Sequence, residues 1–206
     1  MKGYLAVNLP ILRSYTGLSQ DQLASRMGVR KAVIENIETG YTPSPPLSTL
    51  EKLSLVFNVT VEGLIGKEPL LIGERVRIVH VVESIDAQMS FVDAEKIIGA
   101  VYFDSKEIGS YNCFGIKIKD NSMIGDRIGE GDIAIVKQNA PVKNGNTVLC
   151  VVDGKETIIR YYYKMDGVVV LKPANSSGTY PEITRKADDS GLKIIGKVIR
   201  IIQNRD

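Results

Sequence analysis

Hydrophobic residues follow two different patterns along the chain, and the pattern changes near residue 70. In the first 66 residues they recur every three or four positions, as Leu9, Leu12 and Tyr15 do, which places them on one face of a helix. From Val76 onward they form short β-branched runs separated by glycine, which is typical of strands. The sequence therefore predicts a helical domain, a Gly- and Pro-containing connector and a mostly β domain over residues 1–66, 67–75 and 76–206.

Five helices are predicted in the first domain. The first carries the stripe just described, with Pro10 in its opening turn. Ser19 and Gln22 have the spacing of a capping box, which begins the second helix, and Gly28 allows a tight turn after it. The first helix is expected to end at Gly17, three more are expected over about 20–27, 30–39 and 47–57, and Thr60 is expected to cap a last short helix that ends near Ile65.

Eight short runs in the second domain predict strands, because they are rich in β-branched residues and end at turn residues. An arrangement of many short strands with glycine turns is typical of a mostly β domain. The strands are expected over 76–82, 96–103, 114–118, 133–137, 147–152, 157–163, 168–171 and 193–202.

Composition narrows the class of protein. The 206 residues are 44% hydrophobic and 24% charged, which excludes a disordered or collagen-like chain. Two cysteines are too few for a disulfide framework or a zinc site, so we expect a reducing compartment, no metal and no cofactor. There is no apolar leader and no run of about 18 apolar residues, so we expect neither export nor a membrane partner.

The formal net charge of +2 hides a local separation of charge. Residues 1–34 hold five basic side chains and one acidic, whereas residues 35–68 hold five acidic and two basic. Such a charge distribution is typical of a domain that makes a few phosphate contacts. A nonspecific nucleic-acid binder would have a basic surface over a much larger area.

Residues 18–40 predict a helix-turn-helix, in which one helix enters the major groove of DNA while its partner braces it. At about 100° per residue, Val33, Ile34 and Ile37 share one side of the helix expected over 30–39. The opposite side carries Lys31, Ala32, Glu35 and Asn36. The alternative is a plain helical hairpin whose polar side chains are merely solvated.

The outward side chains suit base recognition. Asn36 can pair with adenine, Lys31 with guanine, and the methyl group of Ala32 can touch thymine. Glu35 repels phosphate unless it accepts from cytosine N4 or neutralises a nearby basic group such as Lys31. Phosphate contacts are expected from Gln20, Arg26 and Arg30.

This segment resembles the helix-turn-helix domain of phage repressors and their bacterial relatives. The resemblance covers about residues 5–66 and includes the small Ala24 at the helix crossing and the turn residue Gly28. It implies a five-helix fold and double-stranded operator DNA as partner. The other matching residues are Leu18, Ser19, Gln20, Leu23, Met27, Val29, Ile34, Ile37, Glu38 and Gly40.

The second domain resembles the self-cleaving domain of LexA-like and phage repressors, related to signal peptidases, through the runs 114–123 and 129–136. In that family a serine attacks a peptide bond of its own chain, and a buried neutral lysine takes the serine proton. The resemblance places Ser122 at the nucleophile. It places Ile159 at the lysine, or Arg160 if the register shifts by one residue, and neither side chain can act as the base.

The bond to be cleaved is altered as well. The resemblance places it at Ala87-Gln88, where the family has Ala-Gly or Cys-Gly, and glutamine is bulkier than glycine at a point of close approach. With base and bond both changed, we expect that self-cleavage is lost. His80 is expected to have no catalytic role, and Asp132 to cap a turn.

Together these features predict a phage- or LexA-like repressor that binds operator DNA as a homodimer formed by the β domain, in the bacterial cytoplasm and associated with the nucleoid. Derepression would then need an antirepressor protein, a ligand or another protease. One alternative is an active self-peptidase whose base is Lys155, Lys164 or Lys172. Another is a module whose β domain senses a small ligand, with DNA binding secondary.

Overall fold

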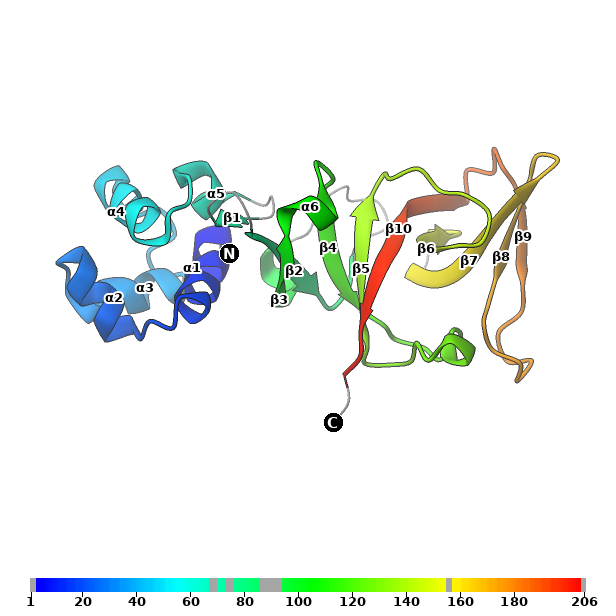
Figure 1. Ribbon diagram of the computed structural model, residues 1–206, viewed down its shortest axis with the longest axis horizontal. Coiled ribbons are helices and arrows are strands. Elements are labelled where there is room, and N and C mark those ends of the chain that lie inside the picture. The colour runs from blue at the N-terminus through cyan, green and yellow to red at the C-terminus, as the bar shows by residue number, and fades with distance from the viewer. Residues whose placement is uncertain (1–2, 67–69, 73–75, 86–93, 155–156, 205–206) are drawn as a thin grey trace. The chain divides into compact units, whose positions relative to one another are not determined.

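The computed structural model describes residues 3–66, 70–72, 76–85, 94–154 and 157–204 (Figure 1). The chain forms two compact units. The first comprises Met1–His80 and Phe91–Gly109, and the second comprises Val81–Ser90 and Ser110–Asp206. The predicted fold class, a five-helix domain followed by a mostly β domain, is confirmed. In the part of the chain that is described, no helix is long and apolar enough to cross a membrane.

The five predicted helices are present in the first unit. Pro10 was expected in the opening turn of the first helix, but that helix begins at Tyr4, so Pro10 lies in its interior. A proline there costs one backbone hydrogen bond, which is tolerated because Leu9 and Leu12 anchor the helix in the core. The helices are α1 (Tyr4–Tyr15), α2 (Gln20–Met27), α3 (Lys31–Glu38), α4 (Leu47–Phe57) and α5 (Val61–Ile65).

The core of the first unit includes strand residues. Leu9, Leu23 and Ile37 are fully buried at its centre, and Ile78 of β2 (Val76–Val82) is buried against the same cluster. Ala100 of β3 (Ile97–Asp104) packs on it as well. The helical module is therefore covered in part by strands that follow it in the sequence.

A buried polar link also joins α1 to β2. The Nε2 atom of His80 lies 2.6 Å from the Oδ1 atom of Asn8, and the Nδ2 atom of Asn8 donates to the carbonyl oxygen of Leu64 at 2.9 Å. Because His80 must donate to an amide oxygen, the bond requires a proton on Nε2, which the neutral ring can carry. Burial lowers the pKa of His80 to about 4, so the ring is neutral near pH 7.

In the first unit, β1 (Leu70–Ile72) pairs antiparallel with the start of β2, and β3 pairs with β2 as well. A short helix, α6 (Ser105–Ile108), follows β3. In the second unit, the end of β2 pairs in parallel with β4, and the order continues as β4-β5-β10-β6-β7-β8-β9. These strands are β4 (Cys113–Lys117), β5 (Ile133–Gln138), β6 (Asn146–Val152), β7 (Thr157–Met165), β8 (Val168–Lys172), β9 (Ile183–Lys186) and β10 (Leu192–Ile202).

All eight predicted strands are present, and two further strands were missed. The strand β1 has three residues and falls inside the expected connector, and β9 contains Ile183 as its single large hydrophobic residue. Neither segment is long or regular enough to show a period of two. Both are sheet members through backbone pairing with a longer neighbour.

The strand β10 pairs with β5 on one side and β6 on the other, and one glycine makes this possible. A Cβ atom on Gly196 would lie 2.3 Å from the carbonyl oxygen of Lys137, closer than atoms can approach. Register shifts in β10 at Ile194/Gly196 and at Val198/Arg200 let the strand bend between its two neighbours. A hydrophobic core in the second unit is built from Val148 and Cys150 of β6 and from Val169 and Leu171 of β8.

The buried His80 predicts a specific pH dependence. Between pH 6.5 and about 4 the unfolded chain binds a proton that the folded chain does not, so the free energy of unfolding falls as the pH falls through that window. The slope contributed by this group is at most about 1.4 kcal/mol per pH unit. Because the chain has one histidine, its ring resonance can be followed directly by NMR, and we expect it to titrate near pH 4.

The control is His80→Gln, which keeps an amide donor for Asn8 and removes the titrating group. Its urea-unfolding free energy should change less between pH 7 and pH 5 than that of the natural chain. A histidine resonance that titrates at the ordinary pKa of about 6.5 would contradict the buried link.

Candidate functional site

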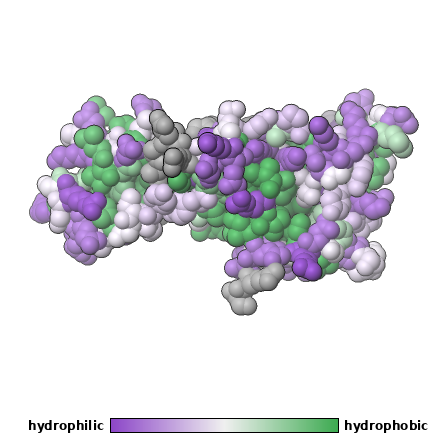
Figure 2. All heavy atoms as spheres, viewed as in Figure 1, coloured by the Kyte–Doolittle hydropathy of each residue, from purple (hydrophilic) through white to green (hydrophobic). Residues whose placement is uncertain are grey.

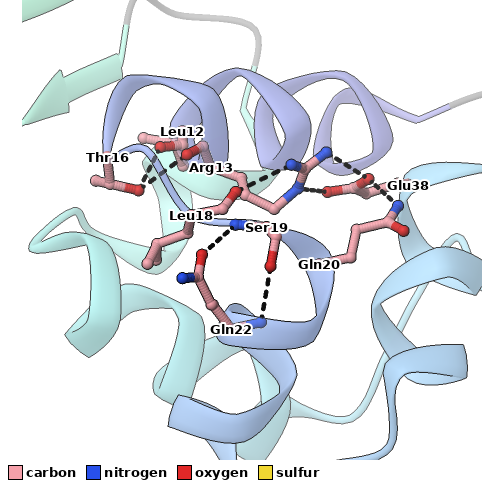
Figure 3. A network of polar contacts seen from close by, with 8 residues as sticks. All are labelled: Leu12, Arg13, Thr16, Leu18, Ser19, Gln20, Gln22 and Glu38. Atoms are coloured by element: carbon pink, nitrogen blue, oxygen red, sulfur yellow. Dashed lines mark hydrogen bonds and ion pairs between the residues drawn. The ribbon is translucent and has the colours of Figure 1, made fainter.

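The first helix of the helix-turn-helix, α2, begins with a reciprocal pair of capping hydrogen bonds. The Ser19 side chain accepts from the backbone N–H of Gln22 at 3.2 Å, and the Gln22 side chain accepts from the backbone N–H of Ser19 at 2.8 Å (Figure 3). This confirms the predicted capping box. The turn after α2 has Gly28 in the left-handed region, with φ of 66°, as a tight turn requires.

An ion pair that the sequence did not indicate braces α1 against α3. The Nε atom of Arg13 donates to the Oε1 atom of Glu38 at 2.7 Å, and its Nη2 atom donates to Oε2 at 3.2 Å (Figure 3). Gln20, at the start of α2, donates its Nε2–H to the same Oε2 atom at 2.7 Å. Glu38 is buried, and its hydrogen bond raises the pKa of Arg13. One carboxylate thus joins three helices.

This network changes the interpretation of Gln20. The residue lies in the first turn of α2, where a phosphate contact was predicted, but its amide nitrogen is already bonded to Glu38. The phosphate contact stays a prediction, and it would fall to the backbone of that turn or to the other end of the Gln20 amide. The one signal for the network in the sequence is Glu38 itself, which the helix-turn-helix resemblance includes.

The predicted reading face of α3 faces solvent. Lys31, Ala32 and Asn36 are exposed, while Ile34 and Ile37 on the opposite side are buried. Glu35 is half-buried, and its Oε1 atom lies 3.6 Å from the Nζ atom of Lys31.

Charges on this face balance one another. Lys31 also reaches Asp21, at 3.3 Å, and the two carboxylates raise the pKa of Lys31. Glu35 therefore contributes to neutralising Lys31 beside Asp21, the closer carboxylate, and its role in binding DNA stays a prediction. Arg26 and Arg30 are exposed beside the face. Their roles in binding DNA stay predictions.

The second candidate site lies in the β unit, where Ser122 is buried next to an arginine. The backbone N–H of Ser122 donates to the Oδ1 atom of Asp120 at 2.9 Å, a turn that the Asp-x-Ser spacing could have indicated. The Oγ atom of Ser122 accepts a hydrogen bond from the Nη1 atom of Arg160. The register that places Arg160 at the family lysine is therefore the one that brings a side-chain nitrogen to the serine.

Ile159, the residue first expected opposite the serine, lies beside this contact. It is buried, pairs with Leu149 of β6, and lines a small cavity of about 60 Å³ together with Ser122 and Met123. The carbonyl oxygen of Ile159 accepts a second hydrogen bond from Arg160 Nη1, at 2.7 Å. In this hydrogen-bond network, Ile159 takes part through its carbonyl oxygen and Arg160 takes part through its guanidinium group.

Arg160 is an unusual group at this position because it is charged and only 5% exposed. Its nearest carboxylate oxygen, Asp120 Oδ2, is 3.9 Å away, and the Tyr180 ring centre lies 5.8 Å from the guanidinium carbon. Among the described residues, no group accepts a hydrogen bond from its Nε atom. Burial lowers the pKa of Arg160, but a guanidinium stays protonated in proteins and cannot take a proton from Ser122.

Neither of the two alternative lysines among the described residues lies buried beside Ser122. Lys164 is exposed, and Lys172 is exposed and paired with Glu182 at 3.1 Å, whereas Ser122 has no exposed surface. Lys155 and the bond Ala87-Gln88 lie outside the described residues. His80 is bonded to Asn8 in the first unit. In the described ranges, then, no neutral base contacts the serine.

A larger groove of about 760 Å³ opens beside this contact. Its walls are mostly apolar, and Arg160 and Lys119 supply positive charge. The other lining residues are Ser84, Ile85, Val152, Asp153, Thr157, Ile158 and Ile183.

Other candidate groups have structural roles. The Oδ2 atom of Asp132 accepts from the backbone N–H of Gly129 at 2.9 Å, which confirms the predicted turn cap. Cys113 and Cys150 are buried thiols that form no disulfide, and burial raises the pKa of Cys150 to about 12. Where the chain is described, no three side chains of the metal-binding types gather into a site.

A helix-turn-helix joined to a β unit with a serine-centred cleft defines the class of two-domain regulators with a peptidase-like domain. The family model described as "Peptidase S24-like" matches residues 80–199, and one described as "Helix-turn-helix" matches residues 16–64. Because the first of these covers more than half of the chain, the protein belongs to the Peptidase S24-like family.

Curated relatives agree with this assignment. A LexA repressor of Magnetococcus marinus is 31% identical over 123 residues, which cover 60% of this chain and 51% of that protein. A LexA repressor of Syntrophobacter fumaroxidans is 31% identical over 113 residues, which cover 55% and 52%. One of Thermosipho melanesiensis is 36% identical over 95 residues, which cover 46% and 45%. The matches thus span about half the length of these relatives.

The Glu38 network predicts a measurable loss of stability. Glu38→Ala leaves the Nε and Nη2 atoms of Arg13 and the Nε2 atom of Gln20 without their acceptor, so the free energy of unfolding should fall by about 2–3 kcal/mol. Urea unfolding followed by far-UV circular dichroism measures this. Glu51→Ala, at an exposed position of α4, should change stability by less than about 0.5 kcal/mol, and equal effects of the two variants would contradict the role of Glu38.

Proposed function

We propose that this protein is a LexA-like transcriptional repressor that binds operator DNA as a homodimer and does not cleave itself. The observation that carries the proposal is the exposed polar face of α3, held on a rigid helix-turn-helix. Family membership and the LexA repressor relatives support it. Operator recognition is assigned to Lys31, Ala32 and Asn36 for bases, with Arg26 and Arg30 on phosphates.

A dimer follows from the size of the helical module. One such module makes few base contacts, so useful specificity needs two copies on half-sites about one helical turn apart. The β unit offers a surface for the pairing. Figure 2 shows a hydrophobic area over β4, β5 and β10, and Ile133 and Ile202, paired across β5 and β10, are both partly exposed. Joining the β units would raise the effective concentration of the second helix-turn-helix.

Loss of cleavage follows from Arg160. The family chemistry needs a base that can lose its proton near neutral pH, and an arginine hydrogen-bonded to Ser122 cannot supply it. Release from DNA would then depend on an antirepressor protein, a ligand or another protease. A DNA-bound repressor of this kind would work in the bacterial cytoplasm, on the nucleoid.

Selection of bound DNA from a random pool tests the first part of the proposal. We expect an inverted repeat whose half-sites are centred about one helical turn apart, because each half-site would bind one helix-turn-helix. The double variant Lys31→Ala and Asn36→Ala should weaken binding to the selected site by about tenfold or more, since each base contact contributes about 1–3 kcal/mol.

The matched control for that variant is Lys143→Ala, which removes one positive charge from an exposed loop of the β unit. It should leave operator affinity unchanged at the same salt concentration. Selection of no motif, or unchanged affinity of the double variant, would sink the proposal and favour a module whose primary role is ligand sensing.

Incubation at about pH 10, near the usual pKa of lysine, tests the loss of cleavage. Alkaline conditions activate a lysine base but leave Arg160 protonated, so we expect the full-length chain to stay intact on a denaturing gel. Fragments that break near Ala87-Gln88 and disappear in Ser122→Ala would show an active self-peptidase instead. A hydrolysis product unaffected by Ser122→Ala would report a contaminating protease and leave the expected result standing.

A further inference from the structure

The groove beside Ser122 holds a charge that the described residues compensate poorly. Arg160 is buried, and its Nε atom has no acceptor among them. A buried charged group without full hydrogen bonding is costly, and native proteins keep such groups chiefly at sites that use them. Arg160 is also one of the residues that line the groove of about 760 Å³, a volume large enough for a ligand, so this buried charge lies at the wall of that space.

The carboxylates near Arg160 do not form a close ion pair with its guanidinium group. Asp120 Oδ2 is 3.9 Å from Arg160 Nη1, and Asp120 Oδ1 already accepts from the backbone of Ser122. Asp153, which lines the groove, is paired with Arg185 at 3.0 Å. Lys119, in contrast, adds a second positive charge to the lining. The lining therefore holds two positive side chains, Arg160 and Lys119, and one carboxylate, Asp153, which is already paired.

The other residues that line the groove indicate which chemical groups a ligand would carry besides an anion. Ile85, Val152, Ile158 and Ile183 supply branched apolar walls. An apolar pocket with one or two convergent polar groups binds ligands by burying an apolar body and orienting it through those groups. A carboxylate matches the flat donor fork of an arginine better than it matches the point charge of a lysine.

We propose that this groove binds a carboxylate ligand that carries an apolar group, with the carboxylate seated against the Arg160 guanidinium. The inference rests on the proposed loss of self-cleavage, because a working peptidase would need this cleft for its own peptide bond. The replacement that removes the catalytic base thus creates an anion-binding group. Both free small acids and the C-terminal carboxylate of a peptide have this chemistry.

Calorimetric titration of the full-length chain with matched acids and amides tests the proposal. The probes are N-acetyl-leucine and acetyl-Val-Ala-Leu, each with a free carboxylate and as the neutral amide. At least one acid should bind about tenfold or more tightly than its amide, because a charge-assisted hydrogen bond is lost in the amide. The acid that binds more tightly identifies the source, a small molecule or a peptide end.

Two variants test whether the carboxylate of the ligand binds at Arg160. Arg160→Gln should abolish the preference for the acid, whereas Asp120→Asn should strengthen acid binding several-fold, because it removes the carboxylate nearest to Arg160 and keeps an acceptor for the backbone of Ser122. Lys164→Gln, an exposed position on the same strand, is the matched control and should leave binding unchanged. If Arg160→Gln does not fold, the proposal is still tested by the comparison of acid with amide and by the effect of Asp120→Asn on acid binding.

Equal binding of acid and amide, or no binding of either acid, overturns the proposal. So does an acid preference that survives in folded Arg160→Gln. A denaturing gel of the same sample shows whether the chain has cleaved itself. Failure of the ligand site and failure of the proposed loss of cleavage are therefore read from separate measurements.

Discussion

The contact between Arg160 and Ser122 sets the chemistry of the β unit. It places a permanent positive charge against the hydroxyl group of Ser122. The strand β7 delivers this side chain because it lies between β6 and β8, with Arg160 opposite Val148. A fold by itself does not imply an activity, so the reaction class depends on the side chains that contact Ser122. Under the proposed function, Arg160 makes this cleft a binding site instead of a reacting one.

The helical module depends on a comparable concentration of polar contacts. Glu38 accepts from both Arg13 and Gln20, so α1, α2 and α3 meet at one carboxylate. A buried acid with two donors is costly to separate from them, which fixes the angle at which α3 is presented. Lys31 and Glu35 can then face solvent on a helix whose other side is locked into the core.

Most of the fold could be predicted from the sequence, since the helices have apolar residues every three or four positions, α2 and α5 begin with capping side chains, and the long strands are rich in β-branched residues. The two short strands could not, because pairing with neighbours rather than any local pattern makes them strands. The same limit applied to the cleft. Sequence comparison left a choice between Ile159 and Arg160, and only the three-dimensional register shows which side chain reaches Ser122. The partners of Glu38 were equally hidden, since Arg13 lies 25 residues away in the chain.

Packing between the helices and β2 has a practical consequence for work with fragments. A fragment cut after residue 66 contains all five helices, but it would lack Ile78 and Ala100, which cover part of their core. It would also lose His80, so the buried oxygen of Asn8 would have no partner from β2. A fragment extended to Gly109 keeps the whole first unit. The natural point of division for expressing the DNA-binding half is therefore some forty residues beyond the last helix of the helix-turn-helix module, which ends at Ile65.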